Sequence, residues 1–496
     1  MEFSSLIFMF LFLPVFLFLF FILKPQARHS FLLIVSLVFY YWGDSSSFIL
    51  LLLSIAVNYI LGHWIDRITS NGVKRVVFYL AITFNLGLLL YYKYFDFILT
   101  NLNNSPHVTN HHDPIHLPLG ISFFTFQALS AIIDIYRKTI TMDKNPIHFG
   151  LYMAFFPKLV NGPITPYHNL SNQIATNKNI TTDDLIYGFQ RLIIGLGKKI
   201  IISDTLAKTA NAIFTIPATE QTAALAWLGI VCFTLQIYFD FSGYTDMAIG
   251  IARLMGFTLG ENFNYPYMAT SIKEFWRRWH ISLTTWLRDY LFLPIAYAVS
   301  RKIKAPRFLG IKAENCAYFS GAVITFFICG LWHGANWTFI VWGTYYGLLL
   351  VIEHAGLGKK MRRKWPVPVQ WFYCQLLVMV GWVFFRSPNL AYAFQYLKAM
   401  AGFSTAPGMR HYVALHLNAE VLIFIMIGLI GMTPLFPKIR QSLHAHQQHP
   451  DLDKTQRFFL FPVANLVYQF YLTIVLFICT MMMAGGTFNP FLYFGF

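Results

Sequence analysis

Long apolar segments recur along the whole chain and are separated by short polar loops. An apolar stretch of about 20 residues is long enough to cross the hydrocarbon core of a bilayer as a helix. Apolar stretches lie near residues 4–23, 30–43, 47–65, 77–96, 118–136, 185–202, 223–241, 316–332, 337–354, 368–385, 419–436 and 463–483. The second is short, and we expect it to be tilted or helped by partner helices. This pattern constrains the fold more than any other feature of the sequence.

The chain is also poor in charge, since 12% of its 496 residues are charged and 56% are hydrophobic. Soluble domains carry about 25% charged residues, so the composition excludes a large soluble enzyme. The sequence therefore predicts an all-α polytopic membrane protein. We expect residues 1–496 to form a single transmembrane domain of about 10–12 spanning helices.

Positive charges fall in alternate loops. Lys24 and Arg28 follow the first apolar stretch, and residues 67–75 and 137–144 are also basic, whereas residues 43–45 and 100–118 contain no lysine or arginine. Cytoplasmic loops are enriched in these residues, so we expect an extracytoplasmic N-terminus. No basic residue precedes the first stretch, which favours a membrane helix over a cleavable signal. The same bias explains the net charge of +16, and no motif indicates nucleic-acid binding.

The stretch from Ser271 to Trp337 contains two histidines, His280 and His333, each preceded by a tryptophan. His333 ends the apolar run that begins at Ala317, so it is expected at membrane depth. An ionisable side chain there is a candidate functional group. The alternative is a histidine that only bonds a neighbouring helix, as polar groups in membrane bundles often do.

Residues Ser271–Leu293 combine charged and aromatic side chains, a pattern that predicts an amphipathic helix at the membrane interface. The cationic face could attract the phosphates of a nucleotide-bearing substrate. Anionic lipid headgroups are the alternative ligand. The candidate binding residues are Trp276, Arg277, Arg278 and Trp279.

Two further segments break the pattern of simple spans. Phe149–Pro166 is apolar, too short to cross the membrane and interrupted by proline and glycine, which is typical of a re-entrant segment buried in protein. Asp240 and Asp246 flank a Ser-Gly pair near the end of another span. They are expected to anchor a discontinuous helix or to pair with Arg277 and Arg278.

The remaining histidine and cysteine side chains that were considered as metal ligands do not have the spacing of a known metal site, so no metal site is predicted. Two histidine-rich loops are otherwise polar, which is typical of solvated segments, and their histidines have no spacing of a metal site. They are His107, His111, His112, His116, His444, His446 and His449. The cysteines Cys232, Cys316, Cys329, Cys374 and Cys479 lie mostly in apolar runs and are interpreted as packing residues.

Four motifs together resemble the membrane-bound O-acyltransferase family, in particular its bacterial branch that acetylates alginate. Phe275–Leu283 with Trp286–Tyr290 and Gly330–Gly334 carry the resemblance, together with residues 238–246 and 118–126. The C-terminal residues 490–496 also resemble that branch. The core motifs thus fall at 118–126, 238–246 and 271–337.

The resemblance implies a helical bundle with re-entrant or interfacial helices around a central funnel, in the inner membrane of a bacterium. His333 matches the family histidine at the narrowest point, and His280 matches a second histidine of the bacterial branch. It also implies acetyl-CoA as a cytoplasmic donor substrate, with no bound cofactor. The acceptor would be an extracytoplasmic polysaccharide, with an alginate-like one favoured, reached directly or through a periplasmic acetyltransferase of the SGNH type.

Acyl transfer from a thioester to a hydroxyl needs a proton acceptor, and a neutral imidazole can supply one. His333 is the predicted base. His280 could orient the thioester, stabilise the oxyanion or line the cytoplasmic entrance, and an acyl-enzyme route is possible without an evident nucleophile motif.

Three alternatives remain at this point. The same fold could acetylate peptidoglycan or transfer D-alanine. A glycan transporter or flippase would share the polytopic topology, and a scaffold that recruits periplasmic enzymes is the third.

Overall fold

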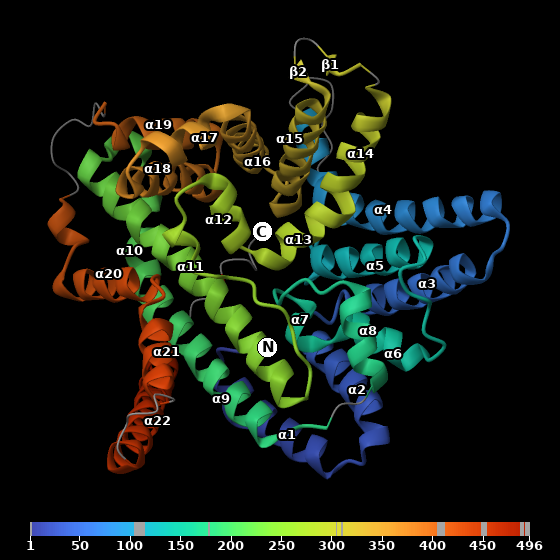
Figure 1. Cartoon of the computed structure of the whole chain (residues 1–496), viewed down its shortest axis with the longest axis horizontal. Helices are drawn as coiled ribbons and strands as arrows, with labels where there is room; N and C mark the ends of the chain where they lie inside the picture. Colours follow the sequence, from blue (N-terminus) through green and yellow to red (C-terminus); the bar gives the residue numbers. More distant parts are fainter. Residues whose placement is uncertain are drawn as a thin grey trace.

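The computed structural model describes residues 2–103, 115–176, 179–303, 305–308, 311–403, 412–447, 454–486 and 491. Within these ranges the chain is almost entirely helical (Figure 1). The first half contains α1 (Leu13–Ile22), α2 (Pro25–Gly43), α3 (Phe48–Arg67), α4 (Asn71–Asn103), α5 (Ile121–Tyr136), α6 (Pro146–Ala154), α7 (Phe156–Leu159), α8 (Tyr167–Thr176), α9 (Thr182–Gly197), α10 (Asp204–Thr215) and α11 (Ala223–Leu254). The second half contains α12 (Ile272–Arg278), α13 (Ile281–Leu287), α14 (Leu293–Lys302), α15 (Ala313–His333), α16 (Trp337–Ile352), α17 (Gly358–Lys364), α18 (Val367–Arg386), α19 (Leu390–Met400), α20 (Ala419–Gly431), α21 (Leu435–Gln447) and α22 (Lys454–Ala484).

Short irregular helices join some of these elements. The π-helical segments are η1 (Phe8–Phe12), η2 (Lys198–Ser203), η5 (Arg288–Phe292) and η6 (Glu353–Leu357), and the 3-10 turns are η3 (Ala218–Glu220), η4 (Pro266–Met268) and η7 (Val413–Leu415). In the basic loop before α15, β1 (Arg307–Phe308) pairs antiparallel with β2 (Ile311–Lys312).

The expected all-α polytopic membrane protein is confirmed. Seven of the described helices are long and apolar enough to cross a membrane: α3, residues 71–102 of α4, α11, α15, the run Trp337–Lys364, α18 and residues 465–484 of α22. Residues 8–22, α5 and α20 are apolar but shorter. The apolar stretch at 185–202 lies in α9 and η2, and the backbone stays helical where the one follows the other at Lys198.

Helix α11 lies at the centre of the molecule and α9 packs along it (Figure 1). Glycines let the two backbones meet, since a Cβ atom on Gly195 would lie 2.6 Å from the carbonyl oxygen of Gly243. Small residues at a helix interface allow this close approach. The predicted discontinuity at Ser242 and Gly243 is therefore wrong, because the glycine serves packing within a continuous helix.

The carboxylates of α11 do not pair with Arg277 and Arg278, contrary to one of the two expectations. Asp246 binds Arg191 of α9 and Lys198 at distances of 2.6 Å to each cation. Asp240 lies 2.7 Å from the amine of Lys199. Pairing as such was predicted correctly, but the partners come from α9 and η2.

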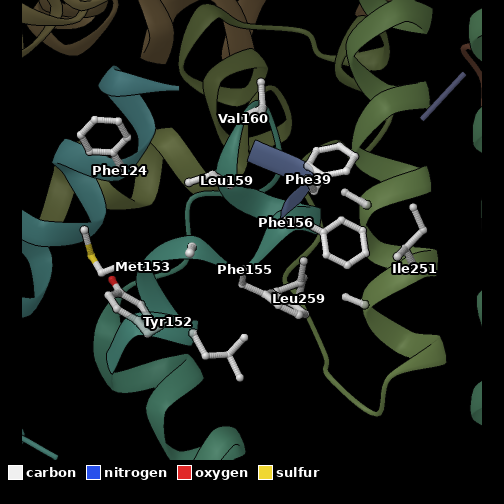
Figure 2. Close-up of a cluster of buried hydrophobic side chains, with 14 of the residues drawn as sticks. Phe39, Phe124, Tyr152, Met153, Phe155, Phe156, Leu159, Val160, Ile251 and Leu259 are labelled. Carbon is white, nitrogen blue, oxygen red and sulfur yellow. The ribbon is translucent and has the colours of Figure 1, made fainter. Parts of the chain in front are cut away.

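The expected non-spanning segment is divided into α6 and α7, which are buried among other helices. Figure 2 shows Phe155, Phe156 and Leu159 in a cluster that includes Phe39 of α2 and Ile251 of α11. Lys158 of α7 is fully buried, with its amine 4.0 Å from the centre of the Tyr152 ring. Irregular backbone is tolerated at depth when protein surrounds it.

Helices α15 and α16 form an antiparallel pair whose backbones are also in contact. A Cβ atom on Gly330 would overlap the carbonyl of Phe339, and one on Gly343 would overlap the carbonyl of Phe326. The turn between the helices is short, and the side chain of Asn336 caps α16 by accepting from the Thr338 N–H at 3.0 Å. This pair fixes the end of α15, where His333 lies.

Two groups of residues singled out in the sequence lie outside the described ranges. They are residues 107–112 of the first histidine-rich loop together with His449, and residues 490 and 492–496 of the C-terminal motif.

Candidate functional site

Residues Ser271–Leu293 do not form one helix as the amphipathic pattern predicted. The chain turns between α12 and α13 at His280, whose backbone is left-handed with φ 44° and ψ 53°. The cause is not local, because the loop residue Asn262 bonds both the side chain of His280 and the backbone that follows it. The break directs His280 into the protein, where it is 1% exposed.

The hydrogen bonds of Asn262 define the tautomer of His280. Its Oδ1 atom accepts from the Ser282 N–H at 3.1 Å and lies 3.1 Å from Nδ1 of His280. A backbone N–H can only donate, so this atom is the amide oxygen and Nδ1 of His280 carries the hydrogen. Burial lowers the pKa of His280 to about 3. The neutral ring therefore presents Nε2 as a proton acceptor.

Nε2 of His280 has no hydrogen-bond partner among the described residues. The network around the other nitrogen reaches the buried segment after α7, because the Ser282 hydroxyl accepts from the Ile164 N–H at 3.0 Å. The segment that contains Ile164 therefore lies beside the His280 site. A buried polar atom without a partner is uncommon in proteins and calls for an explanation.

His333 is the last residue of α15 and is 4% exposed. Aromatic rings meet it edge-on, with centroid distances of 4.9 Å to Trp342 of α16 and 5.3 Å to Phe385 of α18. Trp332 lies 4.9 Å from the same imidazole. These rings exclude bulk water and hold the imidazole in one place.

Trp332 brings the two histidines into one site. Its ring centroid lies 6.3 Å from His280 as well as 4.9 Å from His333. The indole stacks on Phe126 of α5 at 5.3 Å, and its Nε1 hydrogen has no acceptor in the described part of the chain. The sequence predicted both histidines as site residues, and the fold gathers them around this tryptophan from separate helices.

The four predicted binding residues of α12 fall into two groups. Trp276 and Trp279 are 5% and 2% exposed and belong to the aromatic core, where Trp276 contacts Trp342 at 5.7 Å. Arg278 is paired with Glu274 at 2.8 Å. Arg277 is exposed, and no acidic side chain within the described ranges pairs with it. Arg277 is thus the one of the four that can receive a phosphate without losing an existing contact.

Sequence reasoning missed three residues that hold the site. Glu353 accepts from the N–H groups of Ile272 and Lys273 at 2.8 and 3.1 Å and so fixes the start of α12. Lys93 and Tyr94 of α4 contact the end of α15. Lys93 had a signal, because it is an ionisable side chain within an apolar run, the same feature that singled out His333.

A cavity exists elsewhere, lined by Phe20, Arg28, His29, Leu32, Gln173, Ile180, Met255, Gly256 and Phe257. Neither histidine contributes to it. The expected funnel with its constriction at His333 stays a prediction. The aromatic rings around His333 cover it almost completely, and the residue is 4% exposed.

Comparison with known proteins covers most of the chain. Residues 137–385 match the model of the membrane-bound O-acyltransferase family. A probable alginate O-acetylase AlgI of Pseudomonas aeruginosa is 38% identical over 89% of this chain and 84% of its own length. The corresponding protein of Azotobacter vinelandii is 35% identical over the full length of both chains. A peptidoglycan O-acetyltransferase of Helicobacter pylori is 33% identical over 81% of this chain and 80% of its own length.

The family match includes both histidines, the aromatic rings around them and the break between α12 and α13. Identity above one third over the full length of a relative leaves no doubt about common descent. The chain is therefore a multi-pass acyltransferase that belongs to the membrane-bound O-acyltransferase family.

Proposed function

We propose that the chain transfers an acetyl group from cytoplasmic acetyl-CoA to an extracytoplasmic polysaccharide, with His333 as the general base. The observation that carries this proposal is the pair of buried histidines gathered around Trp332. An alginate-like acceptor is favoured because relatives aligned over most of the chain are named as alginate O-acetylases. Peptidoglycan is the alternative acceptor, since another relative is named for it.

The reaction requires one proton to move twice. An acceptor hydroxyl attacks the thioester carbonyl while the imidazole of His333 takes the hydroxyl proton. The tetrahedral intermediate then expels the thiolate of CoA, and the imidazolium returns the proton to form the free thiol. General base catalysis of this kind contributes roughly 100- to 10,000-fold.

His280 has a supporting role that follows from its tautomer. Because Nδ1 donates to Asn262, the neutral ring offers a lone pair at Nε2 rather than a hydrogen. It can therefore accept a hydrogen bond from the acceptor hydroxyl or from a water molecule, and it cannot donate to an oxyanion through Nε2 in this form. A hydroxyl has a single hydrogen, and His333 takes it. We therefore propose that His280 binds a water molecule whose other hydrogen is donated to the oxygen of the acceptor hydroxyl, which orients that hydroxyl for His333.

The donor would bind on the side of α12, where Arg277 is exposed and unpaired with any described acid. The orientation follows from the alternating basic loops, with the N-terminus outside and the loop at 359–364 inside. We further propose that a periplasmic acetyltransferase of the SGNH type receives the acetyl group where the acceptor chain is too large to reach His333.

The experiment uses sealed membrane vesicles with radiolabelled acetyl-CoA. Inside-out vesicles of the wild type should consume acetyl-CoA added outside, and right-side-out vesicles should not. His333→Ala should fold and bind acetyl-CoA but transfer no acetyl group, and His280→Gln should transfer roughly 100-fold more slowly. The matched control is His354→Ala, because this histidine stacks on Tyr318 at 3.8 Å within the α15–α16 region.

Full transfer by His333→Ala would refute the role of the base. Consumption by right-side-out vesicles alone would refute the orientation. If the His354→Ala control lost acetyl transfer as fully as His333→Ala does, the assay would be measuring the stability of the helical bundle and not the chemical step.

A further inference from the structure

The end of α15 receives its hydrogen bonds from another helix. The last carbonyl groups of an α-helix have no partner within the helix. Gly334 N–H bonds the carbonyl of Gly330, which leaves those of Leu331, Trp332 and His333 to be satisfied. Tyr94 of α4 donates its hydroxyl to Leu331 O at 2.5 Å.

Lys93, the neighbour of Tyr94, binds the other two carbonyls. Its Nζ lies 2.5 Å from Trp332 O and 3.2 Å from His333 O. The third contact is the hydroxyl of Ser122 at 3.3 Å. An ammonium group has three hydrogens, so these three acceptors match its capacity.

The electrostatic setting of Lys93 is unusual for a lysine in an apolar helix. No carboxylate in the described part of the chain forms an ion pair with it, and its contacts are all neutral oxygens. Two of them belong to the carboxyl end of α15, where the helix dipole is negative and attracts a cation. The amine also lies 5.9 Å from the centre of the Trp332 ring.

We propose that Lys93 is a positioning residue for acyl transfer. It holds the backbone of both Trp332 and His333, and these residues carry the indole and the imidazole that form the site. Loss of the ammonium would release the last turn of α15 and let the His333 ring move relative to the reacting atoms. The inference rests on the proposed role of His333 as the base.

The test compares Lys93→Met with Lys74→Met. Lys74 also lies on α4 and is buried, but it contacts Tyr136 rather than α15. At a rise of about 1.5 Å per residue it is roughly 28 Å from Lys93 along the helix. Both substitutions remove one ammonium group from α4, and they differ in whether that group contacts the end of α15.

We expect Lys93→Met to lower kcat of acetyl transfer roughly 100-fold, because a displacement of about 1 Å costs this much. The KM for acetyl-CoA should change less than about threefold, since Lys93 does not contact the donor region. Lys93→Arg should recover most of the kcat, because it keeps the charge and the donors. Lys74→Met should keep the wild-type kcat.

Equal kcat values for the two methionine variants would overturn the inference, and so would a change in KM alone. If Lys93→Met does not fold, Tyr94→Phe tests the neighbouring contact at the same end of α15, since it keeps the ring and removes only the hydrogen bond to Leu331. It should lower kcat less than Lys93→Met is expected to, and an unchanged kcat would count against the inference. An active His333→Ala would instead refute the proposed function on which the inference rests.

Discussion

Around α9 and α11 the buried carboxylates face cations, whereas around the two histidines several buried polar atoms have no partner. Asp246 binds Arg191 and Lys198, and Asp240 binds Lys199. Near the histidines, Nε2 of His280 and the indole N–H groups of Trp332 and Trp342 lack acceptors or donors among the described residues.

The difference distinguishes buried polar groups that stabilise the fold from buried polar groups that are available to bind a substrate. A buried charge with a close partner stabilises one packing arrangement, and removal of the partner is costly. A buried polar atom without a partner has lost its hydration for no gain within the fold. Its hydrogen-bonding capacity is then available to a substrate, and at Nε2 of His280 this supports the proposal that catalysis takes place at the histidines.

The largest expected effect comes from breaking the paired region at Lys199. Its side chain is 1% exposed and contacts Asp204 at 2.8 Å and Asp240 at 2.7 Å. Lys199→Met would leave two buried carboxylates without their cation, and we expect a loss of about 3–5 kcal/mol in unfolding free energy. Thermal unfolding in detergent measures it.

The matched control is Lys208→Met, because Lys208 is exposed on the adjacent helix α10. Its effect should stay within about 0.5 kcal/mol. Equal destabilisation by the two substitutions would contradict the conclusion that the ion pairs of Lys199 with Asp204 and Asp240 stabilise the fold.

A smaller effect should appear as a pH dependence of stability at His280. Burial lowers its pKa from 6.5 to about 3, so below pH 6.5 the unfolded chain binds a proton that the folded chain does not. The stability contributed by the neutral ring is present above pH 6.5 and is lost as the pH falls toward 3. At pH 5 the loss is about 2 kcal/mol.

Unfolding of the wild type and of His280→Gln at pH 7 and pH 5 isolates this contribution, because the carboxylates titrate in both proteins. The variant should lose less stability between the two pH values. An identical loss in both proteins would mean that His280 binds a proton equally well in the folded and the unfolded chain.

The smallest expected effect distinguishes the two arginines of α12. Arg277 is exposed and unpaired with any described acid, while Arg278 is held by Glu274. Exposed charge contacts are worth up to about 1 kcal/mol, so Arg277→Ala should raise the KM for acetyl-CoA about 2- to 5-fold. Arg278→Ala should change KM less in the same vesicle assay. The reverse order would move the donor site away from Arg277.

Much of the architecture could be predicted because the apolar runs depend on local composition. The runs at 47–65, 316–332 and 368–385 correspond to α3, α15 and α18. The residues of the site were also predictable in part, since His333 is ionisable within such a run. Lys93 was missed because the average hydropathy of the run at 77–96 conceals a single cation.

The errors arise where distant segments decide the local backbone. Ser242–Gly243 resembles a helix break, but the contact with Gly195 of α9 makes it a packing surface. The apparent continuity of Ser271–Leu293 is interrupted because Asn262 holds His280 in a left-handed conformation. Neither contact can be read from a window of the sequence.

The backbone contacts of Gly330 and Gly343 have a consequence for motion. Helices α15 and α16 touch without intervening side chains, so neither can slide or rotate against the other without a collision between main-chain atoms. We therefore expect the two helices to move together at these glycines. An opening that admits a substrate to the proposed base His333 is then expected to come from rotation of the rings around it or from displacement of the hairpin relative to α4 and α18.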